Sequence, residues 1–311
     1  MFLMRVLPVP PAAEGERADS VSVLFWNVEN FFAPGKMEGK RWSRRRFYTK
    51  CNAVAKTILL AGDSFGALPD LVGLCEIGDS SVMRSLVYAT PLRKLDYRTV
   101  HYESPDRRGI DCALLYRRSR FRLMASKPCH LYDGAGAVMP TRDILLAVFR
   151  QLPGGPEDTE LLAVLVNHHP SKVGGGSEAR RAAAMARLAF LVDSLKSEGI
   201  RRIVAVGDFN DEISWAPAMR PCTEHAPSAG LAGAGSAGAP GTIKFQGRWE
   251  KIDGCPVLEG MEGREYIFAP RHLTEKDAAF GGEKPRRTFS GPRYLGGVSD
   301  HYPVFFIVRG R

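Results

Sequence analysis

The amino-acid sequence predicts a layered α/β fold over residues 20–309. Short apolar runs typical of strands outnumber the helical patterns, and both kinds of element are spread along the whole chain. The sequence shows no internal repeat, and no linker divides the strands into two sets. Strands and helices distributed in this way pack as layers around a hydrophobic core. We therefore expect one folded unit after a flexible N-terminal leader, residues 1–20.

Three segments have the apolar spacing and the end signals of helices. The first lies between Ser43, a residue suited to an N-cap, and Gly62, a residue type that commonly ends helices. The last begins after Ser177 and ends at Gly199. The expected helices are residues 44–60, 80–90 and 178–198.

Runs of apolar residues between turn-forming residues predict the strands. Residues 71–75 are apolar at nearly every position, as in a strand that is buried on both faces. Residues 226–241 predict a flexible loop, and residues 270–297 form a second long polar stretch. The expected strands are residues 21–26, 71–75, 97–102, 111–116, 121–125, 144–149, 161–166, 203–206 and 304–308, with strand character also in 242–258.

The formal net charge of +9 is concentrated in one basic cluster. Such a cluster either attracts a polyanion, such as nucleic acid or anionic lipid, or forms a solvated helix face. The six cysteines stand singly, which argues against a structural zinc site. The members of the basic cluster are Lys36, Lys40, Arg41, Arg44, Arg45, Arg46 and Lys50.

The apolar run at the N-terminus, residues 1–7, is shorter than the core of a secretory signal. No other run approaches the roughly 18–20 apolar residues that cross a bilayer. The cytoplasm is therefore the favoured compartment, with export as the alternative if the leader is a truncated signal peptide. The sequence indicates no obligate protein partner.

Carboxylate, amide and imidazole groups stand at the ends of four predicted strands. Hydrolysis of a phosphate ester needs a hard cation, an aligned water and a stabilised leaving oxygen. Mg²⁺ takes carboxylate and amide oxygens as ligands, so such groups suit this chemistry. Each motif alone is common, but their joint order is specific. The residues are Asn27, Glu76, Asp208 with Asn210, and Asp300 with His301.

In this order the motifs resemble those of the endonuclease/exonuclease/phosphatase superfamily, the DNase I-like metal-dependent phosphoesterases. The resemblance extends over nearly the whole chain and implies a domain at residues 21–309. It also implies a four-layer α/β/β/α sandwich, two packed mixed sheets flanked by helices, with the active site at one open end. The matching segments are residues 26–27, 69–76, 108–116, 141–143, 167–168, 207–210, 249–253 and 299–301.

The resemblance implies roles for the residues at the strand ends. Asn27, Glu76 and Asp300 are expected to hold the principal Mg²⁺ or Mn²⁺. Asp208 and Asn210 are expected to orient the attacking water and the phosphate, and they could also reach a second metal ion.

Two histidines are expected to contact phosphate or transfer protons. His301 is expected to be oriented by Asp253, and His168 to lie near the leaving oxygen with Asp111 as its partner. A carboxylate on the far nitrogen of a histidine fixes its tautomer and raises its basicity, so either histidine could serve as base or acid. His169 is the poorer candidate, because the family pattern places the histidine directly after an asparagine.

Two arginines are expected to bind phosphate. Arg142 and Arg108 would neutralise the phosphate together with Asn210, although surface ion pairs are the alternative for both arginines. Lys172 stands where related sequences often carry Arg, and the two long polar stretches match nothing informative.

The sequence therefore favours a phosphodiesterase, most specifically a nuclease that acts on DNA with little sequence specificity. The first alternative is a phosphomonoesterase or a lipid phosphoesterase of the sphingomyelinase or inositol-phosphate type. A lipid enzyme usually has an apolar loop that touches the membrane, and residues 266–268 are the faint candidate for one. The second alternative is a non-catalytic binding protein on the same fold.

Overall fold

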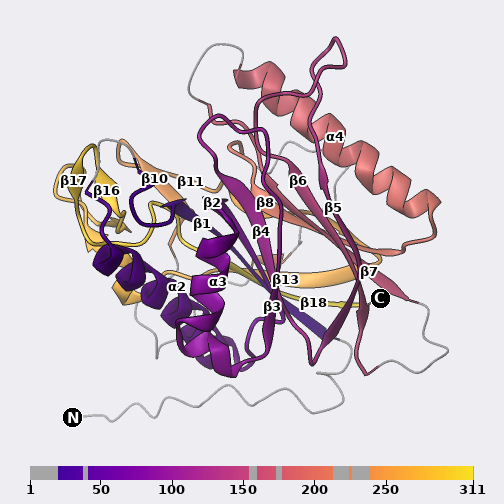
Figure 1. The fold of residues 1–311 in the computed structure, drawn as a ribbon, viewed down its shortest axis with the longest axis horizontal. Helices are drawn as coiled ribbons and strands as arrows, with labels where there is room; N and C mark the ends of the chain where they lie inside the picture. The colour runs from indigo at the N-terminus through magenta and orange to yellow at the C-terminus, as the bar shows by residue number, and fades with distance from the viewer. Residues whose placement is uncertain are drawn as a thin grey trace.

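The frame of the protein is a pair of β-sheets. The computed structural model describes residues 20–37, 41–153, 160–172, 177–212, 224–225 and 239–310. The first sheet has seven strands, in the order β3-β4-β2-β1-β18-β13-β9, and the second has five, in the order β12-β8-β7-β6-β5. Figure 1 shows the strands of both sheets in the middle of the molecule.

The strands of the seven-stranded sheet are β1 (Ser20–Phe31), β2 (Leu71–Ile77), β3 (Tyr97–His101), β4 (Asp111–Arg117), β9 (Glu224–His225), β13 (Met261–Ile267) and β18 (Val304–Gly310). Those of the five-stranded sheet are β5 (Phe121–Cys129), β6 (Ile144–Gln151), β7 (Leu161–His168), β8 (Arg202–Asp208) and β12 (Asp253–Glu259). All the strands expected from the sequence are present. Ser20, which was assigned to the leader, belongs to β1, and residues 1–19 lie outside the described residues.

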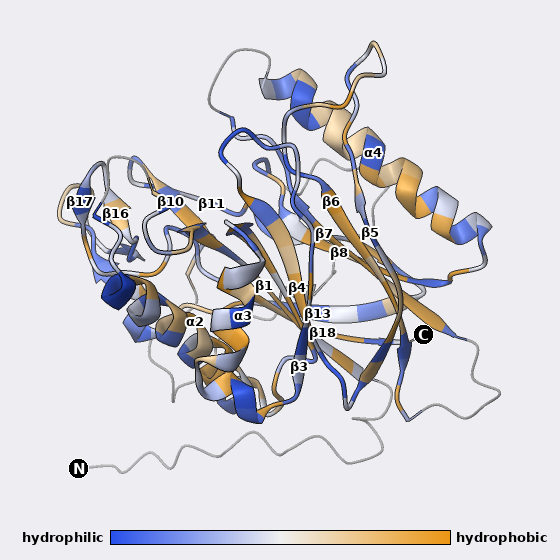
Figure 2. Cartoon of the chain, viewed as in Figure 1, coloured by the Kyte–Doolittle hydropathy of each residue, from blue (hydrophilic) through white to orange (hydrophobic). Residues whose placement is uncertain are grey.

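The two sheets pack face to face, and side chains alternate between the two faces of each strand. In β1, Val23 and Phe25 point into the core between the sheets, with Val164 and Val204 of the second sheet in the same core. Leu24, one residue out of phase, points to the opposite face. Figure 2 shows the apolar residues concentrated along the strands. A one-residue slip of β1 would exchange its two faces, and this fixes its register.

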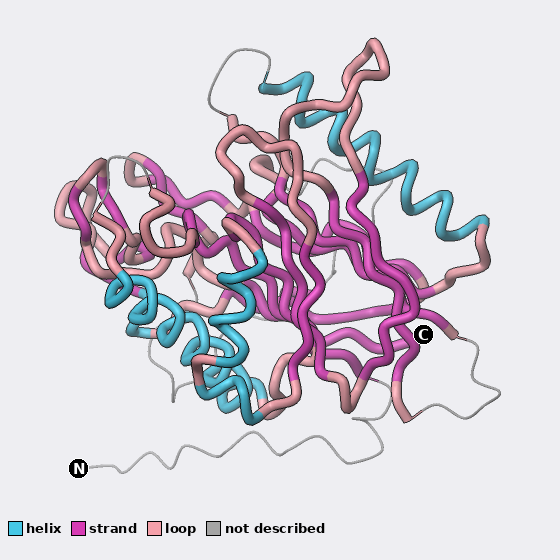
Figure 3. Tube along the Cα trace, in the orientation of Figure 1, coloured by secondary structure: helices cyan, strands magenta, loops and turns pink. Residues whose placement is uncertain are grey.

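Helices cover the outer faces of both sheets (Figure 3). The helices α2 (Arg44–Phe65) and α3 (Ser80–Tyr88) pack against the seven-stranded sheet, in one core with residues such as Trp26. The helix α4 (Ser177–Ser197) packs against the five-stranded sheet. The layers are therefore helix, sheet, sheet and helix, which confirms the predicted α/β/β/α sandwich. In the described residues no helix is long and apolar enough to span a membrane.

One predicted helix end is wrong. Ser43 caps α2 as expected, because its side chain accepts a hydrogen bond from the backbone N–H of Arg46. The helix runs past Gly62, however, and ends at Gly66, which adopts φ 73°. Gly62 is needed for close packing instead, since a Cβ there would lie 2.7 Å from Cδ2 of Leu68.

The C-terminal third of the chain adds three two-stranded ribbons between β8 and β18. They are β10 (Ile243–Phe245) with β11 (Arg248–Glu250), β14 (Thr274–Lys276) with β15 (Glu283–Pro285), and β16 (Phe289–Ser290) with β17 (Arg293–Tyr294). Two short 3-10 helices, Pro91–Lys94 and Arg271–Leu273, complete the described elements. The polar stretch 270–297 is therefore built into the fold. The predicted loop at 226–241 lies outside the described residues, apart from 239–241.

The strand directions bring the polar strand ends to one end of the molecule. β1 and β2 are parallel, and so are β7 and β8. β4, β12 and β18 run antiparallel to these strands. The C-terminal ends of the first group and the N-terminal ends of the second therefore lie together.

Candidate active site

The end of β1 changes direction where it meets β2, and this turn places polar groups in the site. The pairing of the two strands is irregular between Asn27 and Phe31. Glu29 and Asn30 have φ values of 46° and 48°. These angles lie in the left-handed region, which residues other than Gly rarely adopt. Glu76, at the end of β2, also lies there with φ 63°. Strained backbone of this kind collects at functional sites, where the surrounding contacts hold it.

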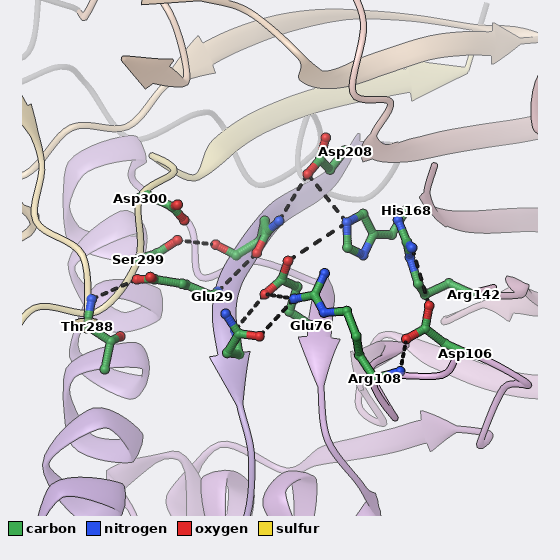
Figure 4. Close-up of polar contacts among 12 residues, drawn as sticks. Glu29, Glu76, Asp106, Arg108, Arg142, His168, Asp208, Thr288, Ser299 and Asp300 are labelled. Carbon is green, nitrogen blue, oxygen red and sulfur yellow. Dashed lines mark hydrogen bonds and ion pairs between the residues drawn. The ribbon is translucent and has the colours of Figure 1, made fainter. Parts of the chain in front are cut away.

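Hydrogen bonds stabilise this turn. The backbone N–H of Asn30 donates to Oε2 of Glu76 at 2.6 Å. The backbone N–H of Glu29 donates to Oδ1 of Asn27 at 3.0 Å. Oε1 of Glu76 faces the other way, 4.0 Å from Nε2 of His168. Figure 4 shows Glu76 between Glu29 and His168.

Asp208 is the centre of the site. Its Oδ2 accepts a hydrogen bond from Nδ2 of Asn27 at 3.0 Å. The same oxygen lies 3.7 Å from Nε2 of His168 and 3.9 Å from Nε2 of His301. Burial raises the pKa of Asp208 to about 7, and the nearby carboxylate of Asp253 adds to the effect. The structure therefore brings together residues that lie up to 274 positions apart in sequence, Asn27 being the first and His301 the last.

His301 and Asp253 form a buried pair, as expected from the sequence. Nδ1 of His301 lies 2.8 Å from Oδ2 of Asp253. The indole N–H of Trp26 donates to the backbone carbonyl of His301 at 2.9 Å and fixes this segment against β1. Burial alone would lower the pKa of His301, but the carboxylates of Asp253 and Asp208 raise it above its usual range. The two carboxylates therefore favour the protonated form of the His301 ring.

The pKa of His168 is shifted in the opposite direction to that of His301. Burial and the positive charge of Arg142 lower the pKa of His168 well below its usual value, so its ring is neutral at neutral pH. Its Nε2 faces Asp208, and its Nδ1 has no hydrogen-bond partner among the described residues. His169 packs edge-on against the ring of Phe209, with centroids 4.9 Å apart, and its backbone N–H donates to the carbonyl of Asp208 at 2.8 Å.

The predicted partnership of Asp111 with His168 is wrong. Oδ1 of Asp111 accepts hydrogen bonds from the backbone N–H and the hydroxyl of Ser104, at 2.8 and 2.6 Å. Its Oδ2 lies 3.2 Å from Nε2 of His101. The reason is that β4 pairs with β3 on this side, so that Asp111 at the start of β4 faces the end of β3.

The two predicted phosphate-binding arginines differ in exposure. Arg142 is buried, donating from Nη2 to the carbonyl of His169 at 2.6 Å and from Nη1 to Oδ2 of Asp106 at 3.3 Å. Arg108 has a side chain that is 50% exposed, and its Nη2 donates to Oδ1 of Asn30 at 2.8 Å. Both lie at the edge of the site in Figure 4. Arg142 is therefore not a surface residue, whereas the half-exposed Arg108 also lies 3.5 Å from Oε2 of Glu76, an ion pair of the kind that the sequence left as the alternative.

Asn210 follows Asp208 in a left-handed conformation with φ 52°. Its backbone N–H donates to Oδ1 of Asp208 at 2.9 Å, and its Nδ2 donates to the carbonyl of His169 at 2.9 Å. The same carbonyl accepts from Arg142. Asn210 and Arg142 are therefore held side by side on one backbone oxygen.

Asp300, the third expected metal ligand, pairs with an arginine. Its Oδ2 accepts a hydrogen bond from Nη2 of Arg287 at 2.9 Å. The neighbouring Ser299 ties this segment to the site, because its hydroxyl donates to the carbonyl of Asn27 at 2.5 Å. Figure 4 shows Asp300 beside Ser299, on the side of the site opposite Arg142.

Four residues of this region escaped the sequence analysis: Glu29, Lys50, Arg287 and Thr288. Lys50 was placed in the surface basic cluster, but it is buried, and its Nζ donates to the carbonyl of Glu29 at 2.5 Å and to Oγ1 of Thr288 at 2.8 Å. Burial lowers the pKa of Lys50 to about 8, opposed by Glu29 and other carboxylates. The signal was present, since Lys50 lies at helical spacing with the buried Phe47 and Val54.

The donor atoms suit a hard divalent cation. Asp208, Asp253 and the neighbouring His301 have polar atoms within 4.8 Å of one another, and Oε1 of Glu76 lies 4.0 Å from Nε2 of His168. The carboxylates are the candidate ligands, because a protonated His301 ring has no free nitrogen lone pair. Mg²⁺ and Mn²⁺ take such carboxylate and amide oxygens. Several buried carboxylates close together repel one another, and a cation relieves this repulsion. The neighbouring thiol of Cys75 is a poor ligand, because burial raises the pKa of Cys75 well above its usual value.

The fold and the site together define a phosphoesterase. The family model described as the endonuclease/exonuclease/phosphatase family matches residues 22–310, and the chain belongs to that family. Its members are phosphoesterase hydrolases that generally depend on metal, so the protein is an enzyme of this kind. A comparison with curated proteins found no match.

Solved structures share the fold at low sequence identity. An endonuclease/exonuclease/phosphatase from Bacteroides vulgatus is 19% identical with a TM-score of 0.61, over 94% of this chain and 99% of that one. The human Nocturnin catalytic domain is 17% identical with a TM-score of 0.56, over 94% and 95%. A mannosyl-6-phosphatase from Bacteroides thetaiotaomicron is 14% identical with a TM-score of 0.59, over 93% and 99%. These likenesses show the fold.

Proposed function

We propose that the protein is a divalent-metal-dependent phosphodiesterase, a nuclease that cleaves DNA with little sequence specificity and uses Mg²⁺ or Mn²⁺. The observation that carries this proposal is a band of exposed arginines beside the site, which we call the basic band. Its members are Arg44 and Arg45 at the start of α2, and Arg286 and Arg293 beside the ribbon β16–β17.

Contacts with aromatic rings hold the start of α2 against the ribbon β16–β17, so that the arginines of the basic band lie together. The guanidinium of Arg46 lies over the ring of Tyr294, 4.2 Å from its centroid. The rings of Trp42 and Phe289 lie 5.8 Å apart. Figure 2 shows the start of α2 as strongly hydrophilic, next to β16 and β17.

The basic band adjoins the site through short stretches of chain. Lys50, which contacts Glu29, is five residues beyond Arg45, or about 8 Å along the helix axis. Arg287, which contacts Asp300, directly follows Arg286. Arginines arranged this way bind the phosphates that flank a scissile bond on a long polyanion, whereas a small phosphate ester does not reach them. Phosphate contacts carry no sequence information, which accounts for the expected low specificity.

The catalytic roles follow from the charges in the site. Asn27 and Glu76 would hold the metal ion, which stabilises the charge of the phosphoryl oxygens when it is bound. Asp208 would accept a proton from the attacking water, since a base with a pKa of about 7 is suited to neutral pH. Asn210 fixes the orientation of Asp208 through its backbone N–H.

The remaining groups would bind the phosphate. His301, whose pKa is raised by Asp253 and Asp208, would donate a hydrogen bond from Nε2 to a phosphoryl oxygen. Arg142 and Arg108 would offset the negative charge from the other side of the site. His168 is neutral and lies against Asp208, so we place it near the leaving oxygen, as a hydrogen-bonding group.

The proposal is tested by nicking of supercoiled plasmid DNA at a series of salt concentrations, with Mg²⁺ and with EDTA. We expect nicking that requires the metal and a binding affinity that falls steeply with salt. The double variant Arg44→Gln/Arg45→Gln should bind plasmid more weakly and lose roughly two units from the slope of log affinity against log salt, about 0.9 for each lost phosphate contact.

The matched control is Arg122→Gln, an exposed arginine on β5 at the opposite end of the sheet, and it should leave the slope unchanged. An unchanged slope in the Arg44/Arg45 variant would show that the basic band does not contact the DNA phosphates. A plasmid left intact by folded protein with Mg²⁺ would refute the nuclease proposal.

One observation favours a second candidate, a lipid phosphoesterase. Phe245 and Phe280 are 60% and 59% exposed. The turn after Phe245 packs against Phe280, since a Cβ at Gly247 in that turn would lie 3.0 Å from the Cβ of Phe280. The strand β10 that carries Phe245 is bridged to the site through Ile243 and His301. The segment named from the sequence, 266–268, packs against α2 instead.

Hydrolysis of sphingomyelin vesicles distinguishes this candidate. If the protein acts on lipid, Phe245→Ser/Phe280→Ser should lower vesicle binding and hydrolysis, because exposed apolar rings insert at a bilayer surface. Phe190→Ser is the control, since Phe190 is 61% exposed on the distant helix α4. If the protein is a DNase, both variants should cleave plasmid as well as the wild-type protein does, and the vesicles should stay intact.

A further inference from the structure

The turn between β3 and β4 carries an aspartate that contacts both arginines at the edge of the site. Oδ2 of Asp106 accepts a hydrogen bond from Nη1 of Arg142 at 3.3 Å, and its Oδ1 accepts the backbone N–H of Arg108 at 2.9 Å. The side chains of Asp106 and Arg142 are 5% and 8% exposed. Figure 4 shows Asp106 between the two arginines, with a dashed line to each. One buried carboxylate therefore joins Arg142, before β6, to Arg108, before β4.

A turn of the same form lies in the hairpin between β5 and β6. There Oδ1 of Asp133 accepts the backbone N–H of Ala135 at 2.9 Å, and the carbonyl of Asp133 accepts that of Gly136 at 3.0 Å. The carbonyl of Asp106 likewise accepts the N–H of Gly109 at 3.0 Å. Aspartate stabilises such turns through a single side-chain oxygen. The second carboxylate oxygen of Asp106 is therefore left for another partner.

That partner, Arg142, is held on two sides. Its Nη2 donates to the carbonyl of His169 at 2.6 Å, and its Nη1 donates to Asp106. Its Nε has no hydrogen-bond partner among the described residues. An arginine has five N–H donors, so this guanidinium keeps donors for a ligand. Without Asp106 it would be a buried charge with no carboxylate partner, and its position would no longer be fixed from both sides.

The two guanidinium groups act on the same part of the site. Burial lowers the pKa of His168, and the positive charges of Arg142 and Arg108 lower it further. Nη2 of Arg108 also lies 3.5 Å from Oε2 of Glu76. The two arginines come from different sheets, because Arg142 precedes β6 and Arg108 precedes β4. Asp106 is bonded to both segments, so it sets their relative position.

We infer that Asp106 is a positioning residue, which holds Arg142 and the turn of Arg108 together so that both guanidinium groups face one phosphate. Arginine recognises phosphate through paired N–H donors in a fixed fork, and holding the donors in place beforehand lowers the cost of binding. The role of Asp106 rests on the phosphate-binding function proposed above for the two arginines. A group that binds phosphate equally in the ground state and the transition state changes KM and leaves kcat nearly unaltered.

The test is Asp106→Asn, which keeps an oxygen for the backbone N–H of Arg108 and puts an amide NH₂ where Arg142 needs an acceptor. We expect the Kd of inorganic phosphate with Mg²⁺, measured by calorimetry, to rise roughly tenfold. KM for bis(4-nitrophenyl) phosphate should rise by a similar factor, with kcat within about threefold. Asp133→Asn is the matched control, since it changes the same kind of turn at an exposed site and should alter none of these values.

Two further variants separate the charge of Asp106 from its turn. If Asp106 acts through Arg142, adding Asp106→Asn to Arg142→Gln should raise the phosphate Kd by less than about twofold beyond Arg142→Gln alone. Asp106→Glu keeps a carboxylate for Arg142 and should stay within about threefold of the wild-type Kd. Melting curves establish that each variant is folded.

Three results would overturn the role of Asp106. They are an unchanged phosphate Kd and KM in folded Asp106→Asn, a tenfold loss of affinity in folded Asp106→Glu, and an equal loss from Asp106→Asn with and without Arg142. In each of them the wild-type protein still binds phosphate or cleaves the diester. A wild-type protein that does neither with Mg²⁺ would refute the proposed function itself, and the role of Asp106 with it.

Discussion

Asp208→Asn should lower kcat for plasmid cleavage by roughly 10³-fold, the size expected when a general base and a charge that orients the reactants are lost together. The substitution removes one negative charge and keeps the shape of the side chain. An Asn oxygen can still accept from the backbone N–H of Asn210, whereas the hydrogen bond from Nδ2 of Asn27 to Oδ2 is lost. Steady-state kinetics with Mg²⁺, together with a melting curve, measures both effects.

The control for this variant is Asp211→Asn, which changes a neighbouring carboxylate that contacts Arg181 at 3.3 Å and is 36% exposed. That variant should keep near-wild-type kcat. Cleavage by Asp208→Asn at close to the wild-type rate would show that Asp208 is not the base, whatever the metal content.

Lys50→Met should destabilise the protein by roughly 3 kcal/mol, the cost of removing one partner from a buried charged group. The ammonium group satisfies the carbonyl of Glu29 and the hydroxyl of Thr288, and both lose a donor. Met is similar in length, so little packing is lost. The free energy of unfolding from urea titration measures the effect.

Lys56→Met on the same helix is the comparison, since Lys56 is exposed and lies away from the apolar face. Its free energy of unfolding should change by less than about 0.5 kcal/mol. Equal free energies of unfolding for Lys50→Met and Lys56→Met would show that Lys50 behaves as a surface residue, as its place in the basic cluster suggested.

The layers of the fold were predictable because buried strands leave a strong sequence signal. The run from Leu71 to Cys75 is apolar on both faces and stops abruptly at Glu76. Val204 to Val206 likewise stops at Asp208 after one Gly. Strand ends that carry polar groups mark the edge of a sheet, so the main site residues followed from this pattern together with the family resemblance.

The partners of these residues were harder to predict, because they depend on which strands and segments become neighbours. Asp111 was paired with His168, but the position of β3 beside β4 turns it toward His101. Arg287 lies in a polar stretch without periodicity, so nothing in the sequence placed it against Asp300. Lys50 was assigned by its charge, whereas its helical spacing was the better guide.

The site thus depends on segments that the sequence left without a role. The stretch 270–297 supplies Arg287 and Thr288, which bind the carboxylate of Glu29. These contacts join the last part of the chain to the end of β1. The reactive centre around Asp208 and the charge pair beside it are therefore assembled from separate parts of the sequence.

One comparison of substrates decides whether this phosphoesterase acts on DNA. Rates of hydrolysis would be measured with one preparation on supercoiled plasmid, mannose 6-phosphate and sphingomyelin vesicles, each with Mg²⁺ and with EDTA. We predict metal-dependent nicking of the plasmid, with much slower hydrolysis of mannose 6-phosphate and of sphingomyelin. An intact plasmid alongside rapid hydrolysis of the sugar phosphate or the lipid would show that DNA is not the substrate.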